Sequence, residues 1–459
     1  MIPRMPLSQF PEISYHDPEI ESAYKWFRSY VKESDWNDRK IKIENYLGGI
    51  VKTSEPFSQS IDKGTLLVIQ KDQIGWYLYL VHTYLYERHK YEYYQGARVL
   101  PIFKRLGSDL QFLKNIVGIN KKMRELLNKR TAEADSFLFE MLTALLWIRN
   151  GWEVKIIEEG KSGKTPDFLV LKGEEQWQVE CKRQKKSSDY TYKETAKRQI
   201  LISHISTLLL HHNILLDITF HVELVSLRDT YLLDILKDLI DKKTKSGRLI
   251  SNKEVEINLT FIDIPAIQNH LKMYFVKSHS PQHLELISGK PVDHSAFTSG
   301  YIGKMFYVGD DNANNLYISE MTNAFGVHSY CDSSDALSAK ARDVRSHIYD
   351  AIGQFSSDTD AIIHIGMETF DGPEVERKRF EKMKYTMENI EPGQNRLCWI
   401  YFHFFQSYSR SYQEWFFDET VSPATSFINP VPPIKKTFLV INEDEITITD
   451  ASHWEIDLP

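Results

Sequence analysis

The spacing of apolar residues between positions 135 and 182 predicts one helix followed by three strands. From Phe137 to Ile148, apolar side chains recur every three or four positions, which predicts an amphipathic helix. The helix is expected to end at Asn150-Gly151, because glycine readily takes the left-handed conformation found at helix ends. Three short runs of apolar or alternating residues follow and predict strands at 152–157, 168–171 and 176–182.

The flanking segments predict further helices and strands. Residues 1–130 are expected to be mostly helical, with an aromatic run at 76–94 that favours a helical core and a basic helix at 120–129. Downstream, helices are expected at 192–211, 231–243 and 336–354, and strands at 214–224, 361–366, 396–405, 437–441 and 445–449. Alternating strands and helices are typical of an α/β sheet.

The strand at 176–182 separates core residues from polar ones. Because successive side chains point to opposite faces of a strand, its odd-numbered residues, which are apolar, are expected to face the core. The even-numbered residues then lie on the other face: Gln178, Glu180 and Lys182. Asp167 begins the neighbouring strand, and a hairpin between the two strands would bring its carboxylate against Glu180.

Two converging carboxylates predict a site for a hard divalent cation. Mg²⁺ prefers oxygen ligands and retains several water molecules, and Mn²⁺ is an alternative. A bound cation lowers the pKa of its water and stabilises charge on a phosphoryl oxygen. A lysine beside the cation would orient the attacking water or neutralise charge on the phosphate. Asp167, Glu180 and Lys182 therefore supply the minimum chemistry for phosphodiester hydrolysis.

Pro166-Asp167 followed by Glu180-x-Lys182 resembles the signature of the PD-(D/E)xK nuclease superfamily, whose fold is that of restriction endonucleases. The order of predicted elements across residues 133–212 agrees with that fold. The resemblance implies that Asp167 and Glu180 bind the metal and that Lys182 is the catalytic lysine. It does not identify a specific family within the superfamily.

Glu140, on the helix that precedes the strands, is implied by the same resemblance as an accessory acidic residue and a further metal ligand. Ordinary structural explanations exist for each of these residues. Glu180 and Lys182 would form a salt bridge on an exposed strand, and Asp167 would be a turn carboxylate after a proline. Glu140 would lie on the solvent face of its helix.

A basic stretch follows the lysine of the motif. The net charge of the chain is −7, so a nucleic-acid enzyme of this composition needs a local basic patch. Residues predicted to contact the phosphate backbone are Lys185, Lys186, Lys197 and Arg198. The alternative is a solvated helix face. DNA is favoured over RNA as the substrate, and the sequence leaves open a homo-oligomer or a partner protein.

The predicted fold class is α/β, with a mixed α+β character. The 459-residue chain is expected to contain a helical N-terminal region at 1–130, a restriction-endonuclease-like core with a central mixed sheet at 131–225, and an α/β C-terminal region at 226–459. The three cysteines are widely spaced and predict neither a zinc site nor a disulfide framework. The sequence contains no long apolar run and no signal-peptide pattern, so we expect no membrane contact and a cytoplasmic location.

Three functions are compatible with the sequence. The first is a Mg²⁺-dependent endonuclease or exonuclease, which by analogy would serve bacterial defence or repair. The second is a nucleic-acid-binding or regulatory protein on the same fold, with silent or conditional cleavage. The third is an interaction scaffold in which the motif is coincidental. Asp167, Glu180 and Lys182 are all present, which argues against a simple loss of activity.

Overall fold

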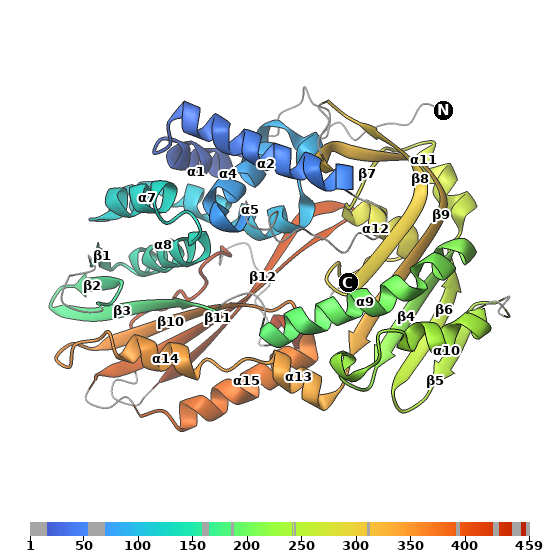
Figure 1. Ribbon diagram of the computed structural model, residues 1–459. Coiled ribbons are helices and arrows are strands. Elements are labelled where there is room, and N and C mark those ends of the chain that lie inside the picture. The colour runs from blue at the N-terminus through green and yellow to red at the C-terminus, as the bar shows by residue number, and fades with distance from the viewer. Residues whose placement is uncertain are drawn as a thin grey trace.

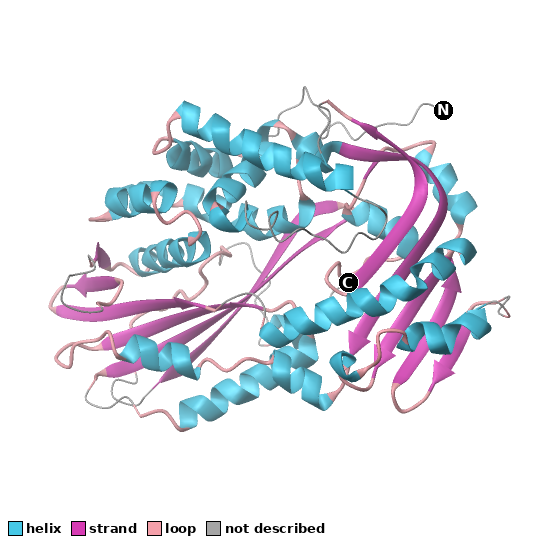
Figure 2. Cartoon of the chain, viewed as in Figure 1, coloured by secondary structure: helices cyan, strands magenta, loops and turns pink. Residues whose placement is uncertain are grey.

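The computed structural model describes residues 16–53, 69–157, 165–184, 188–240, 242, 245–309, 313–391, 395–425, 431–442 and 451–455. Within these ranges the chain is a mixed α/β protein with two six-stranded mixed sheets and helices packed against both, which confirms the predicted α/β class (Figures 1 and 2). None of the helices in these ranges combines the length and the apolar character needed to cross a membrane.

The N-terminal part of the described chain is helical, as the sequence predicted. Its helices are α1 (Pro18–Arg28), α2 (Glu33–Thr53), α4 (Gln73–Tyr86), α5 (Tyr93–Ser108), α6 (Leu110–Lys114) and α7 (Ile119–Asn128). The aromatic run lies in α4, in the connection after it and at the start of α5. Trp76, Tyr77 and Tyr79 are each at most 4% exposed, so these rings form the core of the helical layer.

The first sheet takes its six strands from two distant parts of the chain (Figure 1). One part supplies β1 (Glu153–Ile156), β2 (Phe168–Lys172) and β3 (Glu175–Arg183), and the other supplies β10 (Ala361–Glu368), β11 (Leu397–Arg410) and β12 (Gln413–Thr425). The strand order is β1-β2-β3-β10-β11-β12. β3, β10 and β11 are parallel, whereas β1, β2 and β12 pair in the antiparallel sense.

The second sheet lies between β3 and β10 in the sequence. Its strands are β4 (Ile214–Phe220), β5 (Gly247–Ser251), β6 (Val255–Phe261), β7 (Val276–Lys277), β8 (Phe297–Tyr307) and β9 (Leu316–Cys331). Their order is β5-β6-β4-β9-β7, with β8 also paired to β9. Apolar side chains of α9 (Asp189–His212) and α10 (Tyr231–Ile240) pack on this sheet in one core cluster, and those of α11 (Ile264–Leu271) and α12 (Pro281–Ser288) pack on it in another.

The two sheets do not follow the segment boundaries expected from the sequence. β4 lies within the segment 131–225, but it is a strand of the second sheet. Three strands of the first sheet, β10 to β12, lie beyond residue 225. The segment 131–225 is therefore not a self-contained core, because β3 obtains one of its two neighbouring strands from the C-terminal part of the chain.

Two local predictions in the C-terminal part are wrong. The helix expected at 336–354 is divided into α13 (Ser334–Lys340) and α14 (Arg345–Ile352). Between them the N–H groups of Val344 and Arg345 donate to the Asp343 carboxylate and not to carbonyl groups of a continuous helix. The strand expected at 437–441 does not form. Its N–H groups at 439–441 donate to the buried Glu419 carboxylate. The strand expected at 445–449 lies outside the described residues.

Helices cover both faces of the first sheet (Figure 2). α5 and α8 (Ala134–Arg149) pack on one face, whereas α14 and α15 (Pro373–Glu388) lie on the other. β3 is consequently buried on both sides: Val179 is 0% exposed on the α8 side, and Glu180 is 3% exposed on the α14 side. The polar face predicted for this strand exists, but α14 covers it.

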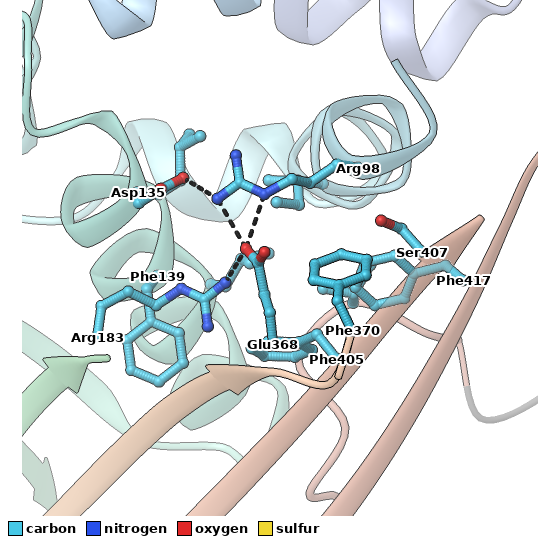
Figure 3. Close-up of a pocket in the computed structure, with 13 residues that line it drawn as sticks. Arg98, Asp135, Phe139, Arg183, Glu368, Phe370, Phe405, Ser407 and Phe417 are labelled. Atoms are coloured by element: carbon cyan, nitrogen blue, oxygen red, sulfur yellow. Dashed lines mark hydrogen bonds and ion pairs between the residues drawn. The ribbon is translucent and has the colours of Figure 1, made fainter. Parts of the chain in front are cut away.

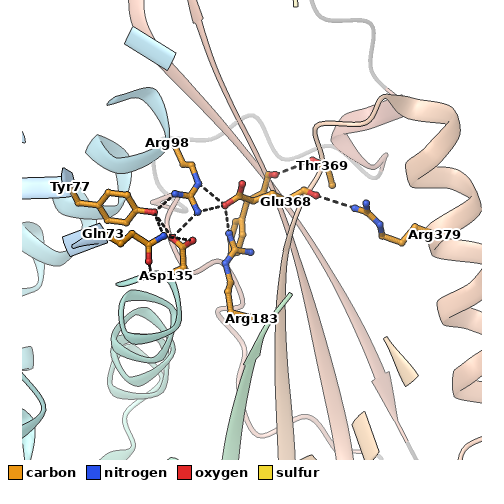
Figure 4. Close-up of polar contacts among 9 residues, drawn as sticks. Gln73, Tyr77, Arg98, Asp135, Arg183, Glu368, Thr369 and Arg379 are labelled. Carbon is orange, nitrogen blue, oxygen red and sulfur yellow. Dashed lines mark hydrogen bonds and ion pairs between the residues drawn. The ribbon is translucent and has the colours of Figure 1, made fainter. Parts of the chain in front are cut away.

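Glu368, at the end of β10, is the centre of a buried ion-pair network (Figure 4). Its carboxylate accepts hydrogen bonds from Arg98 Nε at 2.7 Å and from Arg183 Nη2 at 2.5 Å. Arg98 Nη2 also lies 2.7 Å from Asp135 Oδ1, which accepts a hydrogen bond from the Tyr77 hydroxyl at 2.6 Å. The network therefore joins α4, α5 and α8 to the ends of β3 and β10.

A small cavity of about 20 Å³ lies beside this network (Figure 3). Its polar wall includes the Arg98, Asp135 and Glu368 side chains, and its apolar wall includes Phe139, Phe370, Phe405 and Phe417. The space suits about one water-sized group, so the charged groups are solvated mainly by one another. Burial alone would raise the pKa of Asp135, but Arg98 and Arg183 hold it well below its usual range.

Glu368→Gln should lower the free energy of unfolding by about 3–5 kcal/mol, because two buried guanidinium groups would lose a shared anion. Chemical denaturation measures this change. Glu374→Gln is the matched control, since Glu374 pairs with Arg377 at the surface, where both side chains are more than 40% exposed. This control substitution should lower the free energy of unfolding by less than about 1 kcal/mol. Similar losses in the two variants would contradict a stabilising role for the network.

Candidate active site

Asp167 and Glu180 face each other across the β2–β3 hairpin. Phe168 pairs with Val179, so the residue before Phe168 lies opposite the residue after Val179. Asp167 Oδ2 accepts a hydrogen bond from the backbone N–H of Cys181 at 2.8 Å. Glu180 Oε1 accepts hydrogen bonds from Lys182 Nζ at 2.6 Å and from Gln354 Nε2 at 2.8 Å. The hairpin thus brings the two carboxylates together, as its predicted register required.

A pocket of about 650 Å³ opens at this end of the sheet. All four residues that the sequence singled out for catalysis line it: Glu140, Asp167, Glu180 and Lys182. Side chains from α7 and α14 form two further walls. Lys121, Lys122 and Arg130 line it from α7 and the turn after α7, and His347, Asp350 and Gln354 line it from α14 and the residues after α14.

Glu140 lies on α8 and pairs with a lysine from another helix. The Lys122 ammonium, on α7, forms an ion pair with Glu140 Oε2. The Glu140 side chain is 14% exposed and that of Lys122 is 15% exposed, so the pair is largely buried. Glu140 is therefore not a solvent-facing helix residue, which excludes the ordinary explanation considered for it.

The Glu140 and Glu180 carboxyl groups in this pocket hold protons more strongly than free carboxylates do. Burial, and then the negative charge of Asp167, raise the pKa of Glu140 to about 7 and that of Glu180 to about 7. Burial alone would lower the pKa of Lys122, but Glu140 and Asp167 raise it. These shifts show that like charges are held close together in a poorly solvated place.

The oxygen-rich wall has the chemistry of a site for a hard divalent cation. Among the described residues, Glu180 Oε2 is buried and has no hydrogen-bond partner, which leaves a carboxyl oxygen available for a ligand. No group of three His, Cys, Asp or Glu side chains in the described residues is already arranged to hold a metal ion. Mg²⁺ is usually held by only one or two carboxylates and keeps several waters, so Asp167 and Glu180 fit that cation.

Three residues that contribute to this pocket were not found from the sequence. Gln354 fixes the orientation of Glu180, although the two are 174 positions apart. His347 lies on α14, where burial, and then the positive charge of Lys182, lower its pKa. Lys122 belongs to the basic helix expected at 120–129. Its positive charge was the one feature of the sequence that could have indicated a role in the pocket.

Two of the four basic residues expected to contact nucleic acid are described by the structure, and neither lies at this pocket. Lys185 and Lys186 lie outside the described residues. Lys197 pairs with Asp229, and Arg198 Nη1 donates to the Ser295 carbonyl at 2.8 Å. Both residues lie on α9, and neither lines the pocket. Their charges are used within the molecule, beside the second sheet.

The chain matches no protein-family model, no curated protein and no solved structure. The functional argument therefore rests on the residues of this pocket and on their geometry.

Without metal, protonation of Glu140 and Glu180 should stabilise the fold. Their pKa values rise from 4.5 to about 7, so the folded chain binds these protons more tightly than the unfolded chain. This stability is fully present below pH 4.5 and is lost as the pH rises through about 7. With a chelator present, we expect these residues to lower the free energy of unfolding by about 1–3 kcal/mol between about pH 5 and about pH 8.

Denaturation midpoints across this pH range, compared with those of the double variant Glu140→Gln, Glu180→Gln, isolate the effect. The variant should become the more stable protein as the pH rises, because glutamine does not ionise. At the alkaline end of the range, Mg²⁺ at a concentration 100 times its dissociation constant should raise the free energy of unfolding of the wild type by about 2.7 kcal/mol. Parallel pH profiles for the two proteins would argue against buried, mutually repelling carboxylates.

Proposed function

We propose that the chain is a metal-dependent nuclease that hydrolyses phosphodiester bonds, with DNA favoured over RNA, and that α8 and the first sheet form a restriction-endonuclease-like core. The observation that supports this most is the meeting of Glu140, Asp167, Glu180 and Lys182 in one pocket. An isolated sequence motif has no reason to gather all its members around one space. The raised pKa values of Glu140 and Glu180 support the same conclusion, as does the Glu180 oxygen that lacks a hydrogen-bond partner among the described residues.

Asp167 and Glu180 would hold the cation, with Glu140 close enough for its pKa to respond to their charges. When bound, a divalent cation lowers the pKa of a coordinated water and offsets charge on the phosphoryl group. Lys182 keeps its ammonium 2.6 Å from Glu180 Oε1, at the edge of the same space. From there it holds the attacking water or neutralises a phosphate oxygen, while Gln354 keeps the Glu180 carboxylate in place.

The walls of the pocket favour a polyanion at its mouth. Lys121, Lys122 and Arg130 line it beside the carboxylates; Lys122 also pairs with Glu140, and Arg130 pairs with the exposed Glu133. In this proposal these cations contact the phosphate backbone, the role that the sequence suggested for the basic residues on α9. A phosphate backbone approaching along α7 would meet positive charge before it reached the carboxylates.

A second function is supported by one observation. Two of the carboxylates are already ion-paired, Glu140 with Lys122 and Glu180 with Lys182. An arrangement neutralised in this way suits a nucleic-acid-binding or regulatory protein whose cleavage is silent or conditional. The two functions differ in whether phosphodiester bonds are cut when metal is supplied.

Asp167→Asn and Lys182→Met should each reduce the cleavage rate by at least about 100-fold, because each removes a group that stabilises charge at the reacting phosphate. The assay combines plasmid, linear duplex, single-stranded DNA and RNA with Mg²⁺, Mn²⁺ or a chelator. Asp229→Asn and Lys304→Met are matched controls on surface ion pairs outside the pocket and should retain activity.

Two results would decide against the nuclease. Cutting that continues unchanged in both Asp167→Asn and Lys182→Met would place the chemistry elsewhere. Binding of nucleic acid without cutting under every metal condition would favour the second function.

A further inference from the structure

Lys122 reaches the carboxylates from outside the first sheet. It is one of several basic residues on and just after α7, and the neighbouring Lys121 and Arg124 are exposed to solvent. Met123, Leu126 and Leu127 anchor the same helix in the core, each at most 1% exposed. The backbone of α7 is thus held firmly, while the flexible stem of Lys122 spans the gap to Glu140.

The Lys122 ammonium is held in a place that is unfavourable without anions. Only 15% of its side chain is exposed, and its nitrogen lies 5.2 Å from the centre of the Phe137 ring. Removing an ammonium from water costs several kcal/mol unless nearby charges compensate. Here the ion pair with Glu140 and the field of Asp167 compensate that loss. The carboxylates therefore hold the Lys122 ammonium in the space where they would otherwise stabilise a small metal cation.

We infer that Lys122 is an internal counter-ion that competes with the divalent cation for this carboxylate cluster. This inference rests on the proposed function, because it takes Glu140 and Asp167 as part of the metal site. Two positive species cannot both neutralise the same buried carboxylates at full strength. Metal entry then requires Lys122 to withdraw from Glu140, and the released ammonium lies on the pocket wall where a phosphate oxygen of the substrate would bind it.

Lys122 is accordingly a positioning residue and not a catalytic one. Its ammonium holds the acidic cluster together in the absence of metal and limits metal affinity. A substrate phosphate that draws Lys122 away from Glu140 would strengthen metal binding, and bound metal would strengthen phosphate binding by the same factor. Metal loading would thereby be coupled to the presence of nucleic acid.

The test measures Mn²⁺ affinity at a fixed alkaline pH from the paramagnetic resonance signal of the free ion, with the full chain and no nucleic acid. Lys122→Met should bind Mn²⁺ about tenfold more tightly than the wild type, because one positive charge near the metal is removed at a high effective dielectric constant. Lys121→Met is the matched control: it removes the same charge from the same helix and the same pocket. We expect it to change the affinity much less.

A double-mutant cycle with Glu140→Gln tests the route of the effect. In the Glu140→Gln background, Lys122→Met should tighten Mn²⁺ binding much less than in the wild-type background, since Glu140 no longer holds the lysine beside the metal. Thermal unfolding of each variant shows that the fold persists. If Lys122→Met prevents folding, Lys122→Gln, which keeps a polar side chain, replaces it in the same cycle.

The outcomes separate this inference from the proposed function. Mn²⁺ binding that is lost in Asp167→Asn, together with equal affinities in Lys122→Met and Lys121→Met, would overturn the inference and leave the nuclease proposal standing. Weaker binding in Lys122→Met would also overturn the inference. Mn²⁺ binding that does not respond to Asp167→Asn would overturn both, because the metal would lie elsewhere.

Discussion

The buried Glu368 carboxylate is the contact on which the first sheet and its helical layer both depend. It receives Arg98 from the helical layer and Arg183 from the end of β3, and it is 5% exposed. Arg183 directly follows Lys182, so this network fixes the strand end that carries the candidate catalytic residues. Unpaired buried charges are costly, which leaves few alternative arrangements of these elements.

The long insertion between β3 and β10 does not keep these two strands apart. The second sheet and its helices separate these two strands in the sequence, yet the strands are hydrogen-bonded neighbours. Glu368 and Arg183 hold them together on one face, and Gln354 reaches Glu180 on the other. The pocket is complete only when the N-terminal helices, the β2–β3 hairpin and the segment around α14 have all assembled. The cleavage chemistry proposed for this protein would therefore depend on elements from distant parts of the chain.

The parts of the site that sequence could predict are those governed by local periodicity. Alternation along β3 correctly separated Val179 from Glu180, and the short turn after β2 correctly set Asp167 opposite Glu180. Gln354 and Lys122 were beyond reach, because nothing in a single sequence states which distant segments meet. The basic residues on α9 illustrate the opposite error: formal charge was visible, but the pairing of Lys197 with Asp229 was not. Likewise, the strand predicted at 437–441 does not form, because N–H groups of this segment donate to the Glu419 carboxylate.

Charge balance connects the fold to the chemistry proposed for it. Glu140, Asp167 and Glu180 are gathered where burial makes mutual repulsion strong, and the pKa values of Glu140 and Glu180 rise as a result. Two lysines relieve that repulsion, but they are held differently. Lys182 stands on the same strand as its partner Glu180, whereas Lys122 comes from a separate helix. In the proposed mechanism a divalent cation would displace Lys122 without disturbing Lys182, because withdrawing Lys122 breaks no strand pairing. The proposed site would thus have one lysine that stays with the reacting groups and one that leaves them.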